Sequence, residues 1–169
     1  NLDLQNHGVL QGTGTYDPAG ARTVLNIGQV QPGTPTSVGE LLIAGNYTQD
    51  AAGLIEFNLA SLSNFDKMDV LGNLTLAGTV HVSGLGGYNP NDGDTFTIIT
   101  FDDGVADPAD LLGTFSQISW SDFNPGVSFI ALYLDHSVVL PAVASAVPLP
   151  ASACPVSYTH LTPPPLYPA

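Results

Sequence analysis

The chain has 169 residues and carries 15 acidic side chains against 2 basic ones, which gives a formal net charge of −13 with neutral histidines. Arg22 and Lys67 are its permanent cations. Two cations cannot neutralise a run of phosphates, so the composition excludes nucleic-acid binding and attraction to an anionic membrane surface. It also argues against enzymes that hold phosphate groups with arginine or lysine.

The composition predicts a single all-β domain. Hydrophobic residues make up 44% of the chain, and 18 glycines and 14 prolines accompany few strong helix formers. The single cysteine, Cys154, excludes an internal disulfide framework. No apolar run is long enough for a membrane-spanning helix, and no leader peptide is visible at Asn1. We therefore expect a fragment or a mature chain.

The first sixty residues contain short strands separated by turns. The candidate strand cores are residues 9–10, 24–27, 41–43 and 54–57, and glycines lie near their ends. No segment keeps a 3.6-residue period, so no helix is expected.

A weak repeat indicates how these strands are arranged. Gly45-Asn46-Tyr47-Thr48 matches Gly72-Asn73-Leu74-Thr75 at an offset of 27 residues, and a second strand follows each copy. Self-similarity on this scale favours a solenoid, in which each turn of the chain buries its face on the next. Chance recurrence of Gly-Asn turns is the alternative.

Longer strands are expected from Asp94 onward. Residues 95–101, 115–120 and 127–134 form apolar and β-branched runs, which predict a cap or a small antiparallel layer at one end of the domain. No Asp, Glu, Lys or Arg follows Asp135, and eight of the fourteen prolines lie between Pro141 and Pro168. Proline removes ladder donors, so we predict a β domain over residues 1–140 and a disordered Pro-rich tail over residues 141–169.

The order of these pieces resembles the last turns of bacterial β-helical surface proteins, namely autotransporter passengers and related exported adhesins. The matching pieces are residues 31–33, 41–49, 66–70, 72–80 and 91–98. The resemblance covers about residues 8 to 140. It implies a right-handed parallel β-helix on a cell surface or in secreted material.

A second resemblance lies in the tail. Val147-Pro148-Leu149-Pro150 is similar to the start of a PEP-CTERM sorting signal of exported bacterial proteins. The apolar helix and basic cluster that complete such a signal do not follow, so the resemblance implies a truncated signal. An ordinary Pro-rich linker is the alternative. Residues 155–163 resemble translated sequencing-adapter read-through, which would make the end of the tail artefactual.

Carboxylates are the only plentiful reactive groups. The histidines lack metal-ligand spacing, and Cys154 lies in the Pro-rich tail. The histidines are His7, His81, His136 and His160. Six aspartates lie between Asp92 and Asp110, in sequences typical of turns. A pair of them acting as glycosidase carboxylates is the alternative.

Two weak binding candidates remain. Asn91, Asp92 and Asp94 alternate as the oxygen ligands of Ca²⁺ often do, so they are the candidates for a calcium site. Tyr88 and Trp120 lie beside glycine-rich or polar turns, so they are the aromatic candidates for stacking on a sugar. No catalytic residue and no other cofactor is expected.

The favoured interpretation is a non-enzymatic, exported bacterial cell-surface or matrix protein of the adhesin type. Its fold would be a right-handed β-solenoid with a C-terminal β cap. Its partners would be extracellular polysaccharide or components of the cell envelope. A carbohydrate-binding β-sandwich module and a polysaccharide-degrading β-helix enzyme are the alternatives.

Overall fold

A computed structural model describes residues 4–18, 22–102 and 111–144 of the chain. Within these ranges the protein is all-β, without a helix, and its strands form three mostly parallel sheets. The all-β prediction is therefore confirmed. The described residues contain no helix long and apolar enough to cross a membrane.

The strands divide among three sheets, which we name A, B and C. Sheet A contains β1 (Leu4–Asn6), β4 (Thr23–Asn26), β7 (Asn46–Gln49), β10 (Leu74–Leu76) and β13 (Leu111–Gly113). Sheet B contains β2 (Val9–Gly12), β5 (Gln29–Pro32), β8 (Leu54–Leu59), β11 (Thr79–Gly84) and β14 (Gln117–Ser121). Sheet C contains β3 (Gly14–Tyr16), β6 (Glu40–Ile43), β9 (Lys67–Val70), β12 (Thr95–Phe101), β15 (Val127–Phe129), β16 (Leu132–Leu134) and β17 (Ser137–Ala144).

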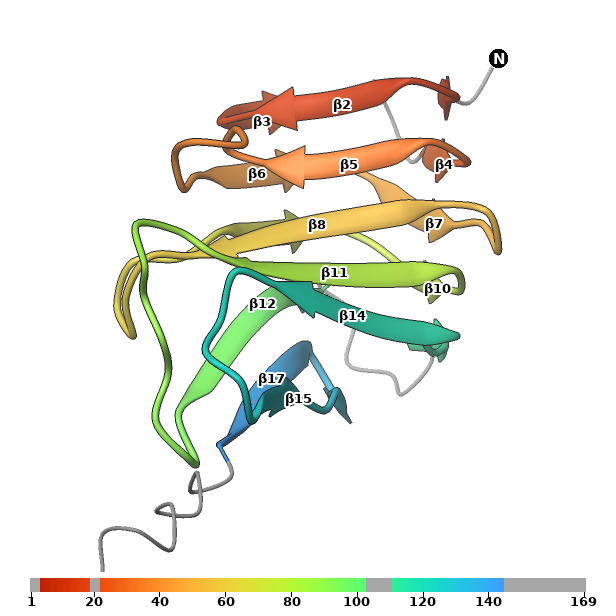
Figure 1. Ribbon diagram of the computed structural model, residues 1–169. Coiled ribbons are helices and arrows are strands. Elements are labelled where there is room, and N and C mark those ends of the chain that lie inside the picture. Colours follow the sequence, from red (N-terminus) through yellow and green to blue (C-terminus); the bar gives the residue numbers. More distant parts are fainter. Residues whose placement is uncertain (1–3, 19–21, 103–110, 145–169) are drawn as a thin grey trace, which may run out of the picture.

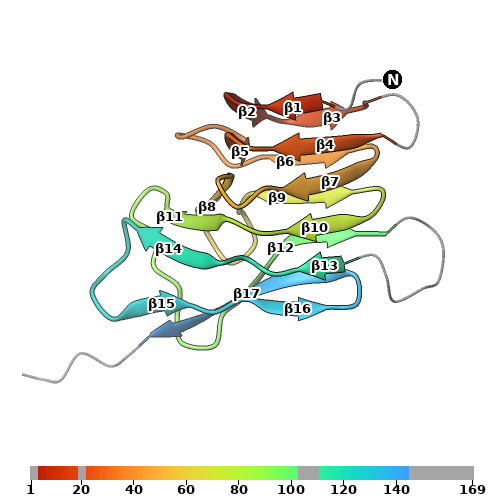
Figure 2. The ribbon, with the colours of Figure 1, turned by 90° about the vertical axis from the view of Figure 1, so that its right-hand side faces the viewer.

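The chain visits the sheets in a fixed order. β1–β3, β4–β6, β7–β9 and β10–β12 each contribute one strand to sheet A, one to sheet B and one to sheet C, and we call each such trio a layer. From β1 to β11, each strand pairs in parallel with the strand three places later along the chain. Figures 1 and 2 show the layers stacked one on the next.

The Gly-Asn repeat of the sequence is a repeat of structure. Tyr47 pairs with Leu74 and Thr48 with Thr75, so the 27-residue offset is the register between β7 and β10. The next strands keep nearly the same spacing, because Ile55 pairs with Val80. The repeated segments are therefore neighbours in sheet A. This arrangement of three parallel sheets does not fit the β-sandwich alternative, which needs two antiparallel sheets.

The C-terminal strands reverse the direction of sheet C. β12 covers the predicted run 95–101; it pairs in parallel with β9 on one side and antiparallel with β17 on the other. The predicted run 127–134 is split into β15 and β16, which both pair antiparallel with β17. Figure 2 shows these strands at the end of the stack opposite the N-terminus.

β17 (Ser137–Ala144) runs through Pro141 and so continues past the predicted domain boundary at residue 140. The amide of Ala142 donates to Asp94 O in the loop before β12, so the nitrogen of Pro141 faces the other side of the strand. On that side, β17 is paired first with β15 and then with β16, and Ile130 lies in the short connection between these two strands. The amide of Ile130 donates a hydrogen bond to Pro141 O. Proline is tolerated because no ladder donor is needed at this junction.

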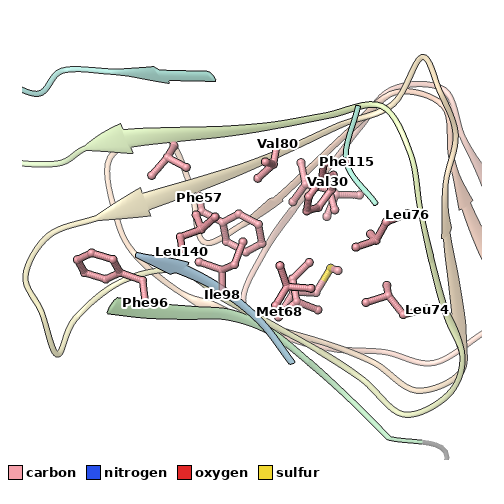
Figure 3. Close-up of a cluster of buried hydrophobic side chains, with 14 of the residues drawn as sticks. Val30, Phe57, Met68, Leu74, Leu76, Val80, Phe96, Ile98, Phe115 and Leu140 are labelled. Carbon is pink, nitrogen blue, oxygen red and sulfur yellow. The ribbon is translucent and has the colours of Figure 1, made fainter. Parts of the chain in front are cut away.

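The hydrophobic core lies between the sheets. Side chains from all three sheets point into it, as Figure 3 shows for Phe57, Met68 and Leu74. The alternation of buried and more exposed residues along the strands sets this direction, with Ile55 and Val80 inward and Glu56 and His81 outward. The sequence pattern predicts such alternation only weakly, since many strands have three or four residues.

A row of amides runs through the first three layers inside the core. The side chain of Asn6 donates to Asn26 Oδ1 at 2.8 Å, and Asn26 donates to Gln49 Oε1 at 2.8 Å. The buried hydroxyl of Tyr47 also donates to Gln49 Oε1, at 2.6 Å. The row ends where Leu76 follows in β10, and Nε2 of Gln49 has no hydrogen-bond partner within the described structure.

The close approach of the layers can be measured at Gly78. A Cβ there would collide with the carbonyl oxygens of Gly53 and Asp50, whereas a Cβ on Gly86, which has nearly the same positive φ, would meet nothing within 4 Å. Both Gly→Ala changes place an alanine in the left-handed backbone region at the same energetic cost. The difference between their losses in the free energy of unfolding therefore measures the steric contact between layers. We expect Gly78→Ala to lower the free energy of unfolding by about 2 kcal/mol more than Gly86→Ala in urea titrations. Equal losses would contradict the stacking.

Candidate functional site

A groove of about 410 Å³ opens at sheet C. Its lining residues are Leu42, Asp69, Val70, Leu71, Thr100, Phe101, Asp102 and His136. Strand register brings them together, because Leu42 pairs with Asp69, Asp69 with Thr100, and Thr100 with Ser137, the residue after His136. We call this site the sheet C groove.

The polar part of the groove consists of two carboxyl groups, Asp69 and Asp102, together with Thr100 and His136. The Thr100 hydroxyl donates to Asp69 Oδ1. A hydrogen bond with Asp69, and then the negative charge of Asp69, raise the pKa of Glu40, while the charge of Lys67 acts in the opposite direction. Glu40, which neighbours the groove without lining it, therefore takes up a proton more readily than an isolated glutamate does.

The rest of the lining limits what the groove can accept. No lysine or arginine lines it, and the Lys67 ammonium lies 5.3 Å from the ring centroid of Phe65, outside the groove. Leu42, Leu71 and Phe101 provide apolar walls. Such a groove fits a neutral or cationic ligand better than an anionic polymer.

Sequence reasoning did not single out this groove. Its polar residues lie far apart in the chain, and no short motif contains two of the facing carboxylates. The 27-residue repeat could have predicted part of it, because residue 69 lies 27 positions after Leu42 and the two residues pair in sheet C. The step from Asp69 to Thr100 is 31 residues, so the repeat fails at the next strand.

The three calcium candidates lie in the loop before β12 and hold it in place. The backbone amide of Asn91 donates to Asp94 Oδ2 at 2.8 Å, and the Asn91 side chain donates to the same oxygen at 3.3 Å. Asp92 Oδ1 accepts from the amide of Ala144, at the end of β17, at 3.1 Å. Over the described ranges, no three His, Cys, Asp or Glu side chains are grouped to hold a metal. The calcium site stays a prediction.

The two aromatic candidates join one cluster but do not form a shared platform. Tyr88 packs edge-on against Phe96 with ring centroids 6.3 Å apart, and Trp120 packs edge-on against Phe129 at the same distance. Phe96 and Phe129 lie between them, 6.5 Å apart. Trp120 remains 40% exposed at the edge strand β14, so part of its side chain is accessible to a ligand.

A histidine on the outer face of sheet B has two serine neighbours. Nδ1 of His81 lies 2.8 Å from Ser119 Oγ, and Nε2 lies 3.2 Å from Ser121 Oγ. Glu56 pairs with His81 in the ladder but accepts its hydrogen bond from Gln29. Since both ring nitrogens contact serines, no acid orients the imidazole as nucleophilic catalysis requires.

Several sequence candidates lie outside the described residues. These are the sorting motif Val147, Pro148, Leu149 and Pro150, the thiol Cys154, the imidazole His160, and the aspartates Asp103, Asp107 and Asp110.

A buried carboxyl group joins two layers at the start of β9. Asp66, which precedes β9, is fully buried; it accepts from the amide of Asn58 at 2.8 Å and from the amide of Gly39, in the previous layer, at 2.7 Å. Burial raises its pKa to about 7, against the opposing effect of these hydrogen bonds. The negative charge of Glu56 adds a smaller upward effect, so the pKa of Asp66 lies near neutral pH chiefly because of burial.

The chain matches no protein-family model and no curated protein. The site must be interpreted from its own chemistry.

Asp66 predicts a loss of stability with rising pH. Its pKa is about 7 in the folded chain and near 3.8 when unfolded, so the folded state holds one more proton between these values. The contribution of protonated Asp66 to the free energy of unfolding is fully present below pH 4. It is lost as the pH rises to 7, by no more than about 1.4 kcal/mol for each pH unit.

Urea titrations from pH 4 to 8 should show that Asp66→Asn reduces this slope. Asp122→Asn removes one negative charge from an exposed position and serves as the control for the loss of charge alone. An unchanged slope in Asp66→Asn would show that Asp66 is already ionised at pH 5.

Proposed function

We propose that the protein is a non-enzymatic, exported bacterial surface or matrix protein built as a right-handed parallel β-helix. The observation that supports it best is the recurrent visit of the chain to sheets A, B and C, with parallel register from layer to layer. Strand stacking of this kind gives a scaffold in which each layer contacts only its neighbours. The antiparallel strands β15, β16 and β17 serve as its C-terminal cap.

The outer faces of the sheets supply the binding surface in this proposal. On sheet A, Thr48 and Thr75 are paired neighbours, and Asn46 Oδ1 accepts from the amide of Asn73 at 2.9 Å. Hydroxyl and amide groups thus recur at the spacing of adjacent strands. Each contact with a sugar hydroxyl is weak, and a row of them acts together on a polymer.

The chemistry of the chain favours neutral polysaccharide as the partner. A formal charge of −13 repels anionic polymers, unless divalent cations bridge the two. Contacts through hydroxyl groups and an exposed indole are little affected by salt, in contrast to ion pairs.

Affinity electrophoresis in gels containing neutral bacterial or plant polysaccharides tests the proposal. We expect retardation of the parent chain that persists in high salt. We expect Thr48→Val/Thr75→Val, which keeps the β-branched shape, to weaken the binding several-fold, whereas Thr97→Val on sheet C is the control and should bind as the parent does. Trp120→Ala should also weaken binding, because the exposed indole is the aromatic group available for stacking on a sugar. Mobility unchanged by every polysaccharide, and no binding to bacterial cell envelopes, would contradict the proposal.

A second function is favoured by one observation, the presence of Asp69 and Asp102 in the sheet C groove. Two carboxyl groups in one groove can hydrolyse a glycosidic bond, one as acid and one as base or nucleophile. Under the leading proposal, incubation with polysaccharides releases no reducing ends. Release that falls at least a hundredfold in both Asp69→Asn and Asp102→Asn, with unchanged Tm, would establish the enzyme instead.

A further inference from the structure

The sheet C groove combines carboxyl groups with apolar walls. Asp69 and Asp102 are its carboxyl groups, whereas Leu42, Leu71 and Phe101 provide the apolar part of its lining. Leu71 is 56% exposed, so a large apolar side chain is open to a ligand at this place. The volume of about 410 Å³ lies in the range of small-molecule sites, which are mostly apolar with a few convergent polar groups.

We infer that the sheet C groove binds a small primary amine whose ammonium group is attached to an apolar body. The ammonium contacts the carboxylate of Asp69, and the apolar body covers Leu42 and Leu71. The inference goes beyond the proposed function, because the polysaccharide contacts of that proposal lie on sheet A and at Trp120.

Asp69 is held in a position from which it can accept hydrogen bonds from an ammonium. It lies between two strands of sheet C, because it pairs with Leu42 of β6 on one side and with Thr100 of β12 on the other. The Thr100 hydroxyl donates to Asp69 Oδ1, which orients the carboxylate and occupies one of its acceptor positions. A carboxylate has about four such positions, so others can serve the N–H donors of a ligand.

The negative charge around Asp69 is not balanced at the groove. A hydrogen bond with Asp69, followed by the negative charge of Asp69, raises the pKa of Glu40. Lys67 pairs with Glu40 in the ladder, but its charge has a weaker, opposite effect on this pKa. No lysine or arginine of the described ranges lines the groove. A cationic ligand therefore meets complementary charge there, whereas an anionic ligand is repelled.

Two other kinds of occupant fit the groove less well. A bound metal ion needs several protein ligands, and the described residues contain no group of three His, Cys, Asp or Glu side chains that could hold one. A protein partner needs a wider contact, since stable protein–protein interfaces bury about 800 Å² on each side. An organic ammonium needs an anchoring carboxylate and apolar contacts, and the groove supplies both.

NMR titration of the full chain with hexylammonium chloride tests the inference. We expect saturable shift changes in the amides of β9 and β12. Hexan-1-ol has the same apolar body without the charge, and it should bind at least about tenfold more weakly. Methylammonium has the charge without the apolar body, and it should also bind at least about tenfold more weakly.

Two substitutions test the two halves of the site. Asp69→Asn should weaken the binding of hexylammonium about tenfold, because it removes the anchoring charge. Leu71→Ala should weaken it about threefold, because it removes apolar contact area. Leu71 is exposed, so its variant tests the groove even if Asp69→Asn does not fold. Asp122→Asn removes one negative charge from an exposed residue outside the groove lining, and this matched control should bind as the parent does.

Three outcomes would overturn the inference. Equal binding of hexylammonium and hexan-1-ol would show an apolar site that does not recognise a cation. Equal losses in Asp69→Asn and Asp122→Asn would show a diffuse effect of the net charge of −13. Tighter binding of a lysine-containing peptide than of the free amine would identify a protein partner instead. None of these results alters the retardation by polysaccharide, so the inference and the proposed function fail separately.

Discussion

The structure depends on one constraint, the simultaneous parallel register of three hydrogen-bonded sheets. Each layer contributes one strand to every sheet, so a shift of one residue in any strand would turn its buried side chains outward. Length can vary only at the corners between strands. Long connections do lie there, for example between β5 and β6, between β8 and β9, and between β11 and β12. Asp66, Asn91, Asp92 and Asp94 lie in two of these connections, whereas Asp69 and Thr100 of the sheet C groove lie on strands.

The same register dictates the chemistry of the interior. Each residue is stacked on the residue at the equivalent position of the next layer. Amide side chains at equivalent positions can therefore hydrogen-bond to one another along a row. Where the row from Asn6 to Gln49 meets Leu76, one amide nitrogen is left without a partner among the described residues. Asp66 is a second departure from an apolar interior, since its carboxyl holds two layers together through their backbone amides.

The sequence predicts the fold more fully than the site. Glycine-rich composition and short apolar runs indicate strands, and the Gly-Asn repeat gives the true register of β7 against β10. Strands such as β5, with Val30 as its single strongly apolar residue besides Pro32, have no periodic signal. The sheet C groove depends on register between residues 27 and 31 positions apart, and on a turn that places His136 beside β12. Because the connections between strands differ in length, the offset between paired residues changes from layer to layer, and the sequence does not reveal it. The candidates at Asn91 and Tyr88 could be proposed because each belongs to a short contiguous motif.

The reversal of chain direction at β17 has a consequence for molecules that meet in solution. A stack whose two ends both presented matching parallel edges could add copies end to end without limit, as in an open filament. Here the strand that follows β12 in sheet C runs antiparallel and is itself covered by β15 and β16. The two ends of the described stack are no longer complementary, so head-to-tail polymerisation lacks a template in one of its three sheets. These antiparallel strands thereby remove one of the three exposed parallel edges at this end of the described stack, and β proteins commonly limit edge-to-edge aggregation by covering an edge in this way.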